Sequence, residues 1–252
     1  MAIFYEVVLA FAKINKKTTA KGYPKNRGGG ATSMAGRYTK QELRQMLHRS
    51  TFRVVMREGI EKLTVKKVSS GCGLSDPYIY QCYSDMAELL KSAYMEIDKK
   101  VSDLIVEFLS VNPAENLVPS AVSRLCWLMW SAYWKFLMED PEQTVFYWRY
   151  YQSAYYSREL ARTRRDNFQP FVAFFMQIAK VMEIEETMNI DVIVSNIIDN
   201  TFSVAVRIHL GFMKQDEMMA QTLYQSVFAF PFHLMGMDIW QETVNAGAAL
   251  EG

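Results

Sequence analysis

The chain has 252 residues, 50% of them hydrophobic, which is enough to bury a sizeable core in one large or two modest domains. Its formal net charge is only +1, but the charges are unevenly spread. Residues 1–67 carry 15 Lys and Arg against 4 Asp and Glu, which leaves 13 basic and 23 acidic residues from the totals of 28 and 27. This asymmetry favours a polyanionic partner for the front of the chain, although a solvated basic tail has the same composition.

Cysteine usage and hydropathy indicate a cytoplasmic protein. Cys72, Cys82 and Cys126 are few and odd in number and lack metal-type pairing, which suits a reducing compartment. Residues 1–12 lack a cleavage pattern, and no later segment reaches about 18 uninterrupted apolar residues. We therefore expect no membrane partner.

In chain order, the first segment, residues 1–38, is expected to be a flexible basic arm. Residues 13–36 are rich in Lys, Thr and Gly and offer no apolar face for a core. Because Met34 stands where a shorter protein could begin, residues 1–33 are either native or an upstream extension, and the sequence leaves both open.

A first helix is predicted from about Thr39 to Gly59, where apolar residues recur at helical spacing. Arg49, Arg53 and Arg57 recur at intervals of four on its other side. They predict a basic stripe on one face of this helix.

Two short helices are predicted next, over Val65–Ser70 and Asp76–Tyr83, joined by a turn that contains two glycines. Thr64 and Ser75 are suitable N-cap residues for them. Pro77 fits the first turn of the second, where a missing N–H costs nothing. The pattern predicts a helix-turn-helix whose second helix can enter a DNA major groove.

The rest of the chain is predicted to be helical. Asp85 opens the next helix, and Glu88 three residues later completes an acidic version of the capping box. We expect an all-α fold with a three-helix helix-turn-helix DNA-binding domain over 39–84, a larger helical ligand-binding and dimerisation domain over 85–240, and a tail over 241–252. The helices expected in the larger domain cover residues 85–110, 117–139, 141–157, 167–183, 189–212 and 216–236.

Residues 40–95, about a fifth of the chain, resemble the TetR family of bacterial transcriptional regulators. The spacing is specific as a set, although no single residue in it is. The residues that carry the resemblance are Gly59, Thr64, Val65, Val68, Gly73, Leu74, Ser75, Ile79, Tyr80, Tyr83, Leu89 and Leu90.

The resemblance implies roles for particular side chains in DNA binding. Thr64 would cap the second helix and touch a phosphate, Tyr80 would bind a phosphate through its hydroxyl, and Tyr78 and Gln81 would face base edges. Because glutamine can pair bidentately with adenine, Gln81 is the first choice for direct readout. The full expected set is Arg37, Lys40, Arg44, Thr64, Ser75, Asp76, Pro77, Tyr78, Tyr80 and Gln81.

The sequence departs from the family in two places. Asp76 and Pro77 stand where family members commonly have Lys and Gly, and Met86 stands where a phosphate-binding Lys is common. Both changes remove positive charge from the DNA side. Either Lys40, Arg44 and the basic arm compensate by binding an adjacent groove, or the affinity for DNA is weak.

Residues 127–175 are unusually aromatic, with 16 Phe, Trp and Tyr in 49 positions against 13% for the whole chain. Most of these rings are expected in the core, but so many are hard to pack without voids. The resemblance implies a pocket there for a small, largely apolar or aromatic effector. Candidates for its wall are Trp127, Trp130, Trp134, Tyr147, Tyr151 and Phe175.

The last two predicted helices carry apolar residues on more than one face, which favours a partner that covers the second face. The resemblance makes that partner a second copy, so that two reading helices lie about 34–36 Å apart, one turn of B-DNA. Expected interface residues are Ile193, Ile197, Phe202, Met219, Leu223 and Phe230.

Neither catalysis nor a cofactor has support in the sequence. No phosphate-binding loop, Gly-x-Ser-x-Gly motif or dinucleotide fingerprint is present. His48, His209 and His233 never approach metal-ligand spacing, and His209 is expected to be a structural hydrogen-bonding residue.

We expect a ligand-responsive regulator, a repressor that releases its operator when the effector tilts the helix from Asp85 to Ser110. Alternatives are an orphan DNA-binding regulator without a ligand, a helical small-molecule enzyme or carrier that has lost DNA binding, and a helical hairpin without a nucleic-acid partner. The regulator hypothesis requires the polar flank of residues 75–83 to face outward, backed by cations from earlier in the chain. If that flank is buried, or if the arginine stripe is turned away from it, the regulator hypothesis should be abandoned.

Overall fold

The computed structural model describes residues 38–111, 118–184, 189–216 and 218–238. Within these ranges every regular element is an α-helix, which confirms the all-α prediction. None of the described helices is both long enough and apolar enough to cross a bilayer. The predicted tail over 241–252, and Arg37 with nearly all of the predicted arm, lie outside the described residues.

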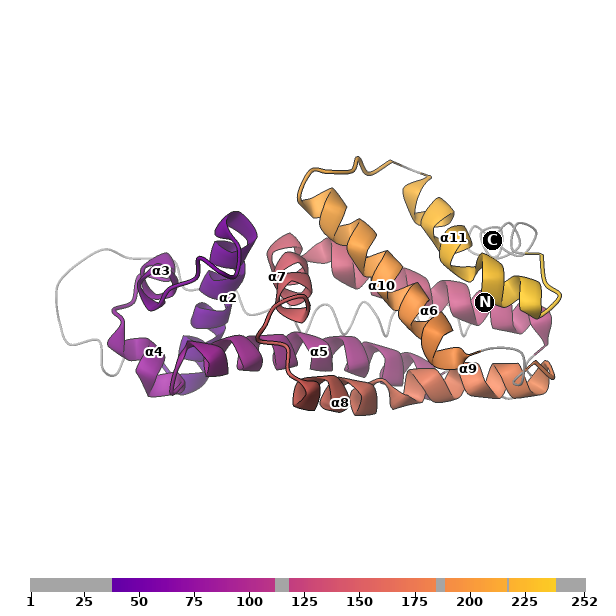
Figure 1. Cartoon of the computed structure of the whole chain (residues 1–252), viewed down its shortest axis with the longest axis horizontal. Coiled ribbons are helices and arrows are strands. Elements are labelled where there is room, and N and C mark those ends of the chain that lie inside the picture. Colours follow the sequence, from indigo (N-terminus) through magenta and orange to yellow (C-terminus); the bar gives the residue numbers. More distant parts are fainter. Residues whose placement is uncertain (1–37, 112–117, 185–188, 217, 239–252) are drawn as a thin grey trace. The chain divides into compact units, whose positions relative to one another are not determined.

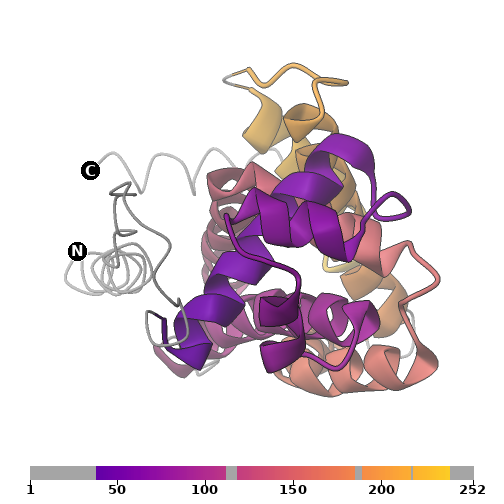
Figure 2. The same ribbon diagram turned by 90° about the vertical axis from the view of Figure 1, so that its left-hand side faces the viewer.

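Three helices form the end of the molecule that faces the viewer in Figure 2. They are α2 (Lys40–Glu58), α3 (Val65–Gly71) and α4 (Pro77–Cys82). Helix α2 ends where predicted, at Gly59, whose φ of 94° lies in the left-handed region that glycine tolerates best. Apolar residues from all three helices, including Leu47, Val68 and Ile79, are fully buried between them. These contacts give the short helices α3 and α4 the tertiary support that their length requires.

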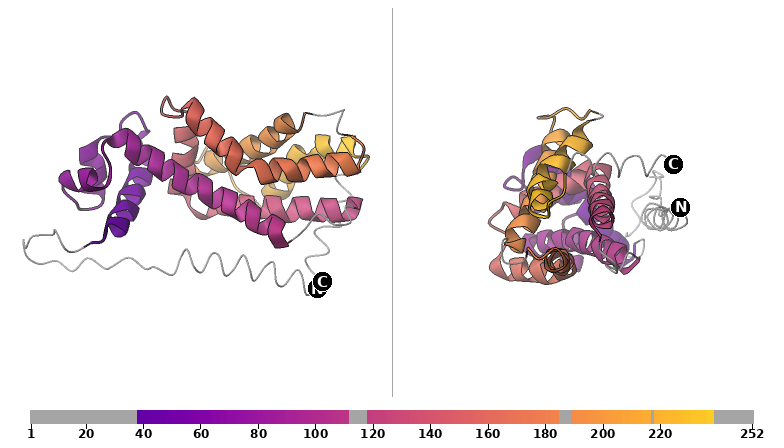
Figure 3. Two further views of the ribbon diagram at one scale, coloured as in Figure 1. Left: turned by 90° about the horizontal axis from the view of Figure 1, so that it is seen from below. Right: turned by 90° about the vertical axis from the view of Figure 1, so that its right-hand side faces the viewer.

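Helix α5 (Met86–Val111) begins beside α4 and continues along the larger group of helices (Figures 1 and 3). The Asp85 carboxylate accepts a hydrogen bond from the Glu88 N–H at 2.8 Å, as the capping prediction requires. The Glu88 carboxylate reaches the N–H of Ser84 at 2.5 Å, one residue earlier than in a standard capping box. Hydrogen bonds from the N–H groups of Glu88 and Ser84 thus fix the start of α5.

The larger group surrounds an aromatic core. Helix α7 packs against both α2 and α10, so it lies between the helix-turn-helix and the last helices. The helices of this group after α5 are α6 (Pro119–Glu139), α7 (Pro141–Tyr151), α8 (Arg158–Asn167), α9 (Gln169–Val181), α10 (Ile190–His209) and α11 (Met219–Leu234).

One predicted span is wrong, and one helix was missed. The helix expected over 141–157 ends at Tyr151, and α8 (Arg158–Asn167) was not predicted. Helix α8 contributes a single fully buried side chain, Leu160, so it has no apolar stripe for a periodicity argument to detect. Its N-cap was visible, because Ser157 accepts a hydrogen bond from the Leu160 N–H at 3.2 Å.

Candidate functional site

The helix-turn-helix is built from helix α3, a tight turn and helix α4. The Thr64 hydroxyl accepts a hydrogen bond from the Lys67 N–H at 3.3 Å, which confirms its role as N-cap of α3. The turn places Gly73 at φ 69° and returns the Leu74 N–H to the Ser69 carbonyl at 2.9 Å. Leu74 is therefore buried, and the chain enters α4 at a fixed angle.

Helix α4 begins at Pro77, one residue later than expected. Its N-cap position is taken by Asp76 and not by Ser75, which corrects the capping prediction. Pro77 lies in the first turn, as predicted. Ile79 and Cys82 are buried against the other two helices, and Tyr83 closes the same core.

The outward flank of α4 is open to solvent. Tyr80 is 59% exposed, although tyrosine is a large and partly apolar residue. Tyr78 is half-buried. The other flank residues, all exposed, are Ser75, Asp76, Pro77 and Gln81. The flank is thus available to a partner, which is the first of the two conditions set by the regulator hypothesis.

Asp76 does more than face solvent. Its carboxylate accepts a hydrogen bond from the buried hydroxyl of Ser69, so it connects α4 to α3. This contact gives the acidic side chain a structural role within the motif. Sequence reasoning missed it, because the two residues belong to different helices of the motif.

Two cations from helix α2 lie near the C-terminal end of α4. The Arg44 guanidinium is 5.5 Å from the centre of the Tyr83 ring. Burial raises the pKa of the Cys82 thiol, and the charges of Arg44 and Lys40 oppose that rise. The side chains of Lys40 and Arg44 are both exposed. They supply the positive charge beside the reading helix that the hypothesis requires, whereas Arg37 lies outside the described residues.

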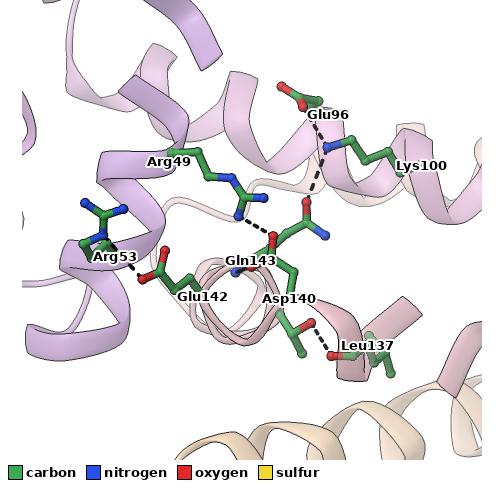
Figure 4. A network of polar contacts seen from close by, with 9 residues as sticks. Arg49, Arg53, Glu96, Lys100, Leu137, Asp140, Glu142 and Gln143 are labelled. Carbon is green, nitrogen blue, oxygen red and sulfur yellow. Dashed lines mark hydrogen bonds and ion pairs between the residues drawn. The ribbon is translucent and has the colours of Figure 1, made fainter. Parts of the chain in front are cut away.

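The arginine stripe of α2 has a different role from the one expected. Arg49 pairs with Asp140, and the Arg53 Nε atom is 3.5 Å from a Glu142 carboxylate oxygen (Figure 4). Both acidic residues belong to the start of α7, so this part of the stripe faces α7. The prediction that the stripe backs α4 is wrong for Arg49 and Arg53, because the acidic N-terminal turn of α7 binds them. The condition placed on the arginine stripe therefore fails for these two residues, and the cations beside α4 are Lys40 and Arg44 instead.

Arg149 of α7 binds the C-terminal end of α2, donating to the carbonyl of Val55 and, at 3.3 Å, to that of Met56. Carbonyls in the last turn of a helix lack intrahelical partners, so a cation there stabilises the helix end. Helix α7 therefore holds α2 by charges at both of its own ends.

The aromatic interior is closely packed. The rings of Trp130 and Trp134 are stacked, with centres 5.8 Å apart and planes inclined by 6°, and the Trp130 N–H donates to Thr201 at 3.0 Å. Trp127 packs edge-on against Tyr224. Phe175 packs edge-on against neighbouring Phe rings of α9. These four expected pocket residues thus contribute to one continuous set of ring contacts.

The other two expected pocket residues, Tyr147 and Tyr151, surround a buried ion pair. The Tyr147 hydroxyl donates to Asp98 at 2.6 Å, and the Arg164 Nε atom lies 3.5 Å from the same carboxylate. The Arg164 guanidinium stands 4.9 Å from the centre of the Tyr151 ring. Because the Asp98 side chain is fully buried, this pairing and the bond from Tyr147 compensate the cost of removing its charge from water.

The apolar cavity found in this interior measures only about 20 Å³, room for about one water molecule. Of the six expected pocket residues, Trp130 alone lines it. The other lining residues are Ile105, Met129, Tyr133, Phe168, Phe171, Ile197, Ile198 and Phe228. A drug-sized ligand occupies several hundred Å³, so an effector would require the helices around this cavity to separate.

Most of the expected dimer-face residues are already used inside the chain. Those that are fully buried are Ile193, Ile197, Phe202 and Leu223. Met219 is half-buried, and Phe230 is 58% exposed. The periodicity argument counted both apolar stripes of α10 and α11 as surface, whereas packing against α6, α7 and α9 covers most of them. Val192, also on α10, is 63% exposed and was not predicted.

No metal site is visible. Within the described ranges, no group of three or more His, Cys, Asp and Glu could hold an ion. His209 is a structural residue, as expected, because its Nε2 atom lies 2.8 Å from the Leu137 carbonyl. His48, which the sequence argument considered only as a metal ligand, lies in the core between Tyr83 and Glu96. The position of His48 on the apolar face of α2 was the feature of the sequence that could have placed it in the core.

Comparison with known proteins identifies the fold. No family profile matches the chain, and no curated protein matches it. Solved structures of similar fold include a TetR-family transcription regulator from Marinobacter aquaeolei VT8, which is 15% identical, has a TM-score of 0.60 and covers 74% of this chain and 94% of its own. The chain thus has the fold of TetR-family regulators, with an N-terminal helix-turn-helix and a larger helical part.

Two further structures show the same fold. A TetR-family transcription regulator from Shewanella sp. PV-4, described as putative, is 12% identical, with a TM-score of 0.58 and coverage of 77% of this chain and 96% of its own. The transcriptional regulator FadR from Bacillus subtilis, solved in complex with stearoyl-CoA, is 13% identical, with a TM-score of 0.54 and coverage of 73% and 96%.

Proposed function

We propose that the chain is a DNA-binding transcriptional regulator that places helix α4 in the major groove of an operator. The observation that carries this proposal is the open polar flank of α4, with Tyr80 and Gln81 exposed and Arg44 beside its far end. A short helix held rigidly by two others, with polar side chains directed outward, is what a major groove admits. The likeness of the fold to known regulators supports the same function.

In this proposal the side chains of the flank divide into two groups. Tyr80, Thr64, Ser75, Lys40 and Arg44 contact phosphates and fix the orientation of the domain. The residues that face base edges are Pro77, Tyr78 and Gln81, with Gln81 pairing to adenine. Asp76 mainly positions α4 through Ser69.

The proposal is tested with the duplex upstream of the gene that encodes the chain, by fluorescence anisotropy at several salt concentrations. Gln81→Ala should weaken binding by about 10- to 100-fold, since a bidentate pair contributes about 1–3 kcal/mol. Gln169→Ala, a substitution of an exposed glutamine at the start of α9, is the matched control and should bind as the wild type does. Equal affinities for all three proteins would contradict the proposed reading helix.

We further propose that the chain works as a homodimer and represses transcription until an apolar or aromatic effector enters the helical interior. The dense aromatic packing supplies the lining for such a molecule, and binding requires a state in which the cavity is wider. Because a ligand that binds only the folded state stabilises it, a true effector must raise the melting temperature, and the rise must grow with the logarithm of its concentration once that concentration exceeds the Kd.

The small size of the cavity favours a second candidate, an orphan regulator whose aromatic interior is only core. The two candidates differ in one observable. An effector-responsive protein shows a rise in melting temperature together with loss of duplex binding for at least one apolar acid, ester or planar aromatic compound. An orphan regulator keeps both properties unchanged across the same panel.

A further inference from the structure

A series of polar contacts begins at the C-terminal end of α4, in which Tyr83 and His48 are buried, Lys100 is half-buried and Glu96 is 42% exposed. The Tyr83 hydroxyl lies 2.7 Å from Nε2 of His48, and Nδ1 of His48 lies 2.8 Å from a Glu96 carboxylate oxygen. Because an ionised carboxylate only accepts, Nδ1 of His48 carries the proton in the contact with Glu96. His48 therefore connects the end of α4 to the middle of α5.

The contacts continue from α5 to α7. Lys100 lies 2.8 Å from the second oxygen of Glu96 and donates to the Gln143 side-chain carbonyl at 3.4 Å (Figure 4). The Gln143 side chain is buried, and its backbone N–H donates to Asp140 at 3.1 Å. Asp140 in turn binds Arg49 of α2. Gln143 is thus connected to α5 through Lys100 and to α2 through Asp140 and Arg49.

The same corner of the fold is connected to the last helices. The Leu137 carbonyl, at the end of α6, accepts from the Thr144 hydroxyl at 2.8 Å and from Nε2 of His209 at 2.8 Å. Thr144 directly follows Gln143 in α7, and His209 ends α10. A displacement of α10 or of the α6–α7 corner therefore acts on the residue that Lys100 contacts.

We propose that Lys100 and Gln143 are positioning residues, which set the placement and rigidity of helix α4 through the network Tyr83–His48–Glu96–Lys100–Gln143. This inference goes beyond the proposed function, because it concerns how the helical interior and the reading helix communicate, whether or not DNA is the partner. The coupling is physical because consecutive contacts share a residue, and partly desolvated hydrogen bonds in series reinforce one another.

The Lys100–Gln143 contact is the point at which the network can be opened. Lys100 is held by Glu96 within its own helix, so movement of α7 breaks the longer contact to Gln143 first. Glu96 then keeps its other partner, His48, but loses the restraint that α7 provides through Lys100. In this proposal α4 is more constrained when Lys100 contacts Gln143 and less constrained when that contact is broken.

The test is amide hydrogen exchange of the full chain, without DNA or ligand, read at Tyr78–Tyr83. Lys100→Met and Gln143→Leu should each speed exchange in α4 by several-fold while the amides of α9 and α11 keep their wild-type rates. Lys99→Met is the matched control, because Lys99 pairs with Asp103 on the exposed side of the same helix. Unchanged exchange in α4, or equal acceleration in every helix, would overturn the proposal.

A double substitution separates coupling from simple loss of stability. In a Tyr83→Phe background the network is already cut at its first contact, so Gln143→Leu should add no further acceleration in α4. An additive effect would show that Gln143 acts on α4 by another route. If Gln143→Leu proves unstable, Gln143→Glu keeps the side-chain size and adds an ion pair to Lys100. This variant should leave α4 exchange unchanged or slower, and faster exchange would count against the network.

Discussion

The charge and the contact of Asp76 are expected to have opposite effects on the proposed binding of DNA. Its carboxylate holds α4 on α3 through the Ser69 hydroxyl, which stabilises the reading helix. Its negative charge stands at the start of that helix, where phosphates are expected, and this weakens association. The two effects can be separated, because an amide oxygen accepts the same hydrogen bond without carrying the charge.

Asp76→Asn is therefore expected to bind duplex DNA several-fold more tightly at low salt, with the free energy of unfolding changed by less than about 1 kcal/mol. Anisotropy titrations and urea unfolding check the two quantities. Asp103→Asn, which removes an exposed acid from α5, is the control for net charge. Weaker binding by Asp76→Asn would mean that the carboxylate itself reads a base.

Glu96 gives the polar network a pH dependence of known sign. The hydrogen bond from His48 and the charge of Lys100 lower the pKa of Glu96 to about 2, from an ordinary value of 4.5, while Tyr83 contacts His48 from the other side. A depressed carboxyl pKa stabilises the folded state above pH 4.5, and this contribution is lost as pH falls towards 2. Glu96→Gln should thus be less stable than wild type at pH 6, and the difference should shrink below pH 4.5.

Urea unfolding of both proteins from pH 6 to pH 2.5 measures this difference. Glu107→Gln, which alters an exposed acid of the same helix, is the control and should show a difference that is small and independent of pH. A Glu96→Gln difference that stays constant or grows as pH falls would contradict the assigned contacts.

At the scale of elements, the packing of α3 on α2 depends on a pair of small residues. The Ser50 hydroxyl donates to the Val68 carbonyl at 2.6 Å, and a Cβ atom added at Gly71 would collide with the Ser50 oxygen. The close approach of the two helices therefore requires glycine at position 71, although its φ is ordinary. A bulkier residue there must push α3 away from α2.

Gly71→Ala should lower the free energy of unfolding by about 1–3 kcal/mol, since overpacking a tight contact costs that much. The second substitution Ser50→Ala makes room for the added methyl group, so the double variant should lose less stability than the two single variants together. Urea unfolding of the four proteins measures the interaction. Strict additivity would mean that the two residues do not meet.

The sequence predicted those elements whose residues carry a local signal. The limits of α2 and α3, the Thr64 cap and the early proline of α4 all follow from residues a few positions apart. Helix α8 was missed because its sequence is polar on nearly every face, and its support comes from ions, such as the pair of Arg164 with Asp98. Contacts of this kind join residues far apart in sequence, which no local pattern reveals.

The candidate site was predictable to the same extent. The exposed flank of α4 follows from the helix-turn-helix pattern, as do its buried residues. The arginine stripe was assigned to the wrong partner, because a row of charges specifies a face of α2 but not the element that covers it. Asp140 and Glu142, at the start of α7, decide that question, and they lie about 90 residues away in sequence.

At the scale of the whole molecule, the surface left for a second copy is narrower than the sequence indicates. Ile193, Ile197 and Phe202 pack inside the chain, so a dimer face on α10 and α11 must use what remains outside. Phe230 and Val192 are the large apolar side chains exposed on these helices in the described part of the chain. Exposed large apolar residues of this kind are candidates for a protein interface.

Phe230→Arg is accordingly expected to weaken self-association by at least tenfold, since a charge at an apolar contact is costly to desolvate. Sedimentation velocity over a range of protein concentrations measures the effect. Met176→Arg, at a 55% exposed position on α9, tests whether any added surface charge does the same. Dissociation by Met176→Arg alone would place the interface on α9.

The most direct test of the central claim is selection of bound sequences from a pool of random DNA duplexes. A dimer that reads DNA with two copies of α4 predicts enrichment of an inverted repeat whose half-sites are centred about one helical turn, or a small multiple of it, apart. Gln81→Ala should lose the preference at one position of each half-site. Failure of the wild-type protein to enrich any sequence at low salt, where phosphate contacts are strongest, would contradict the account.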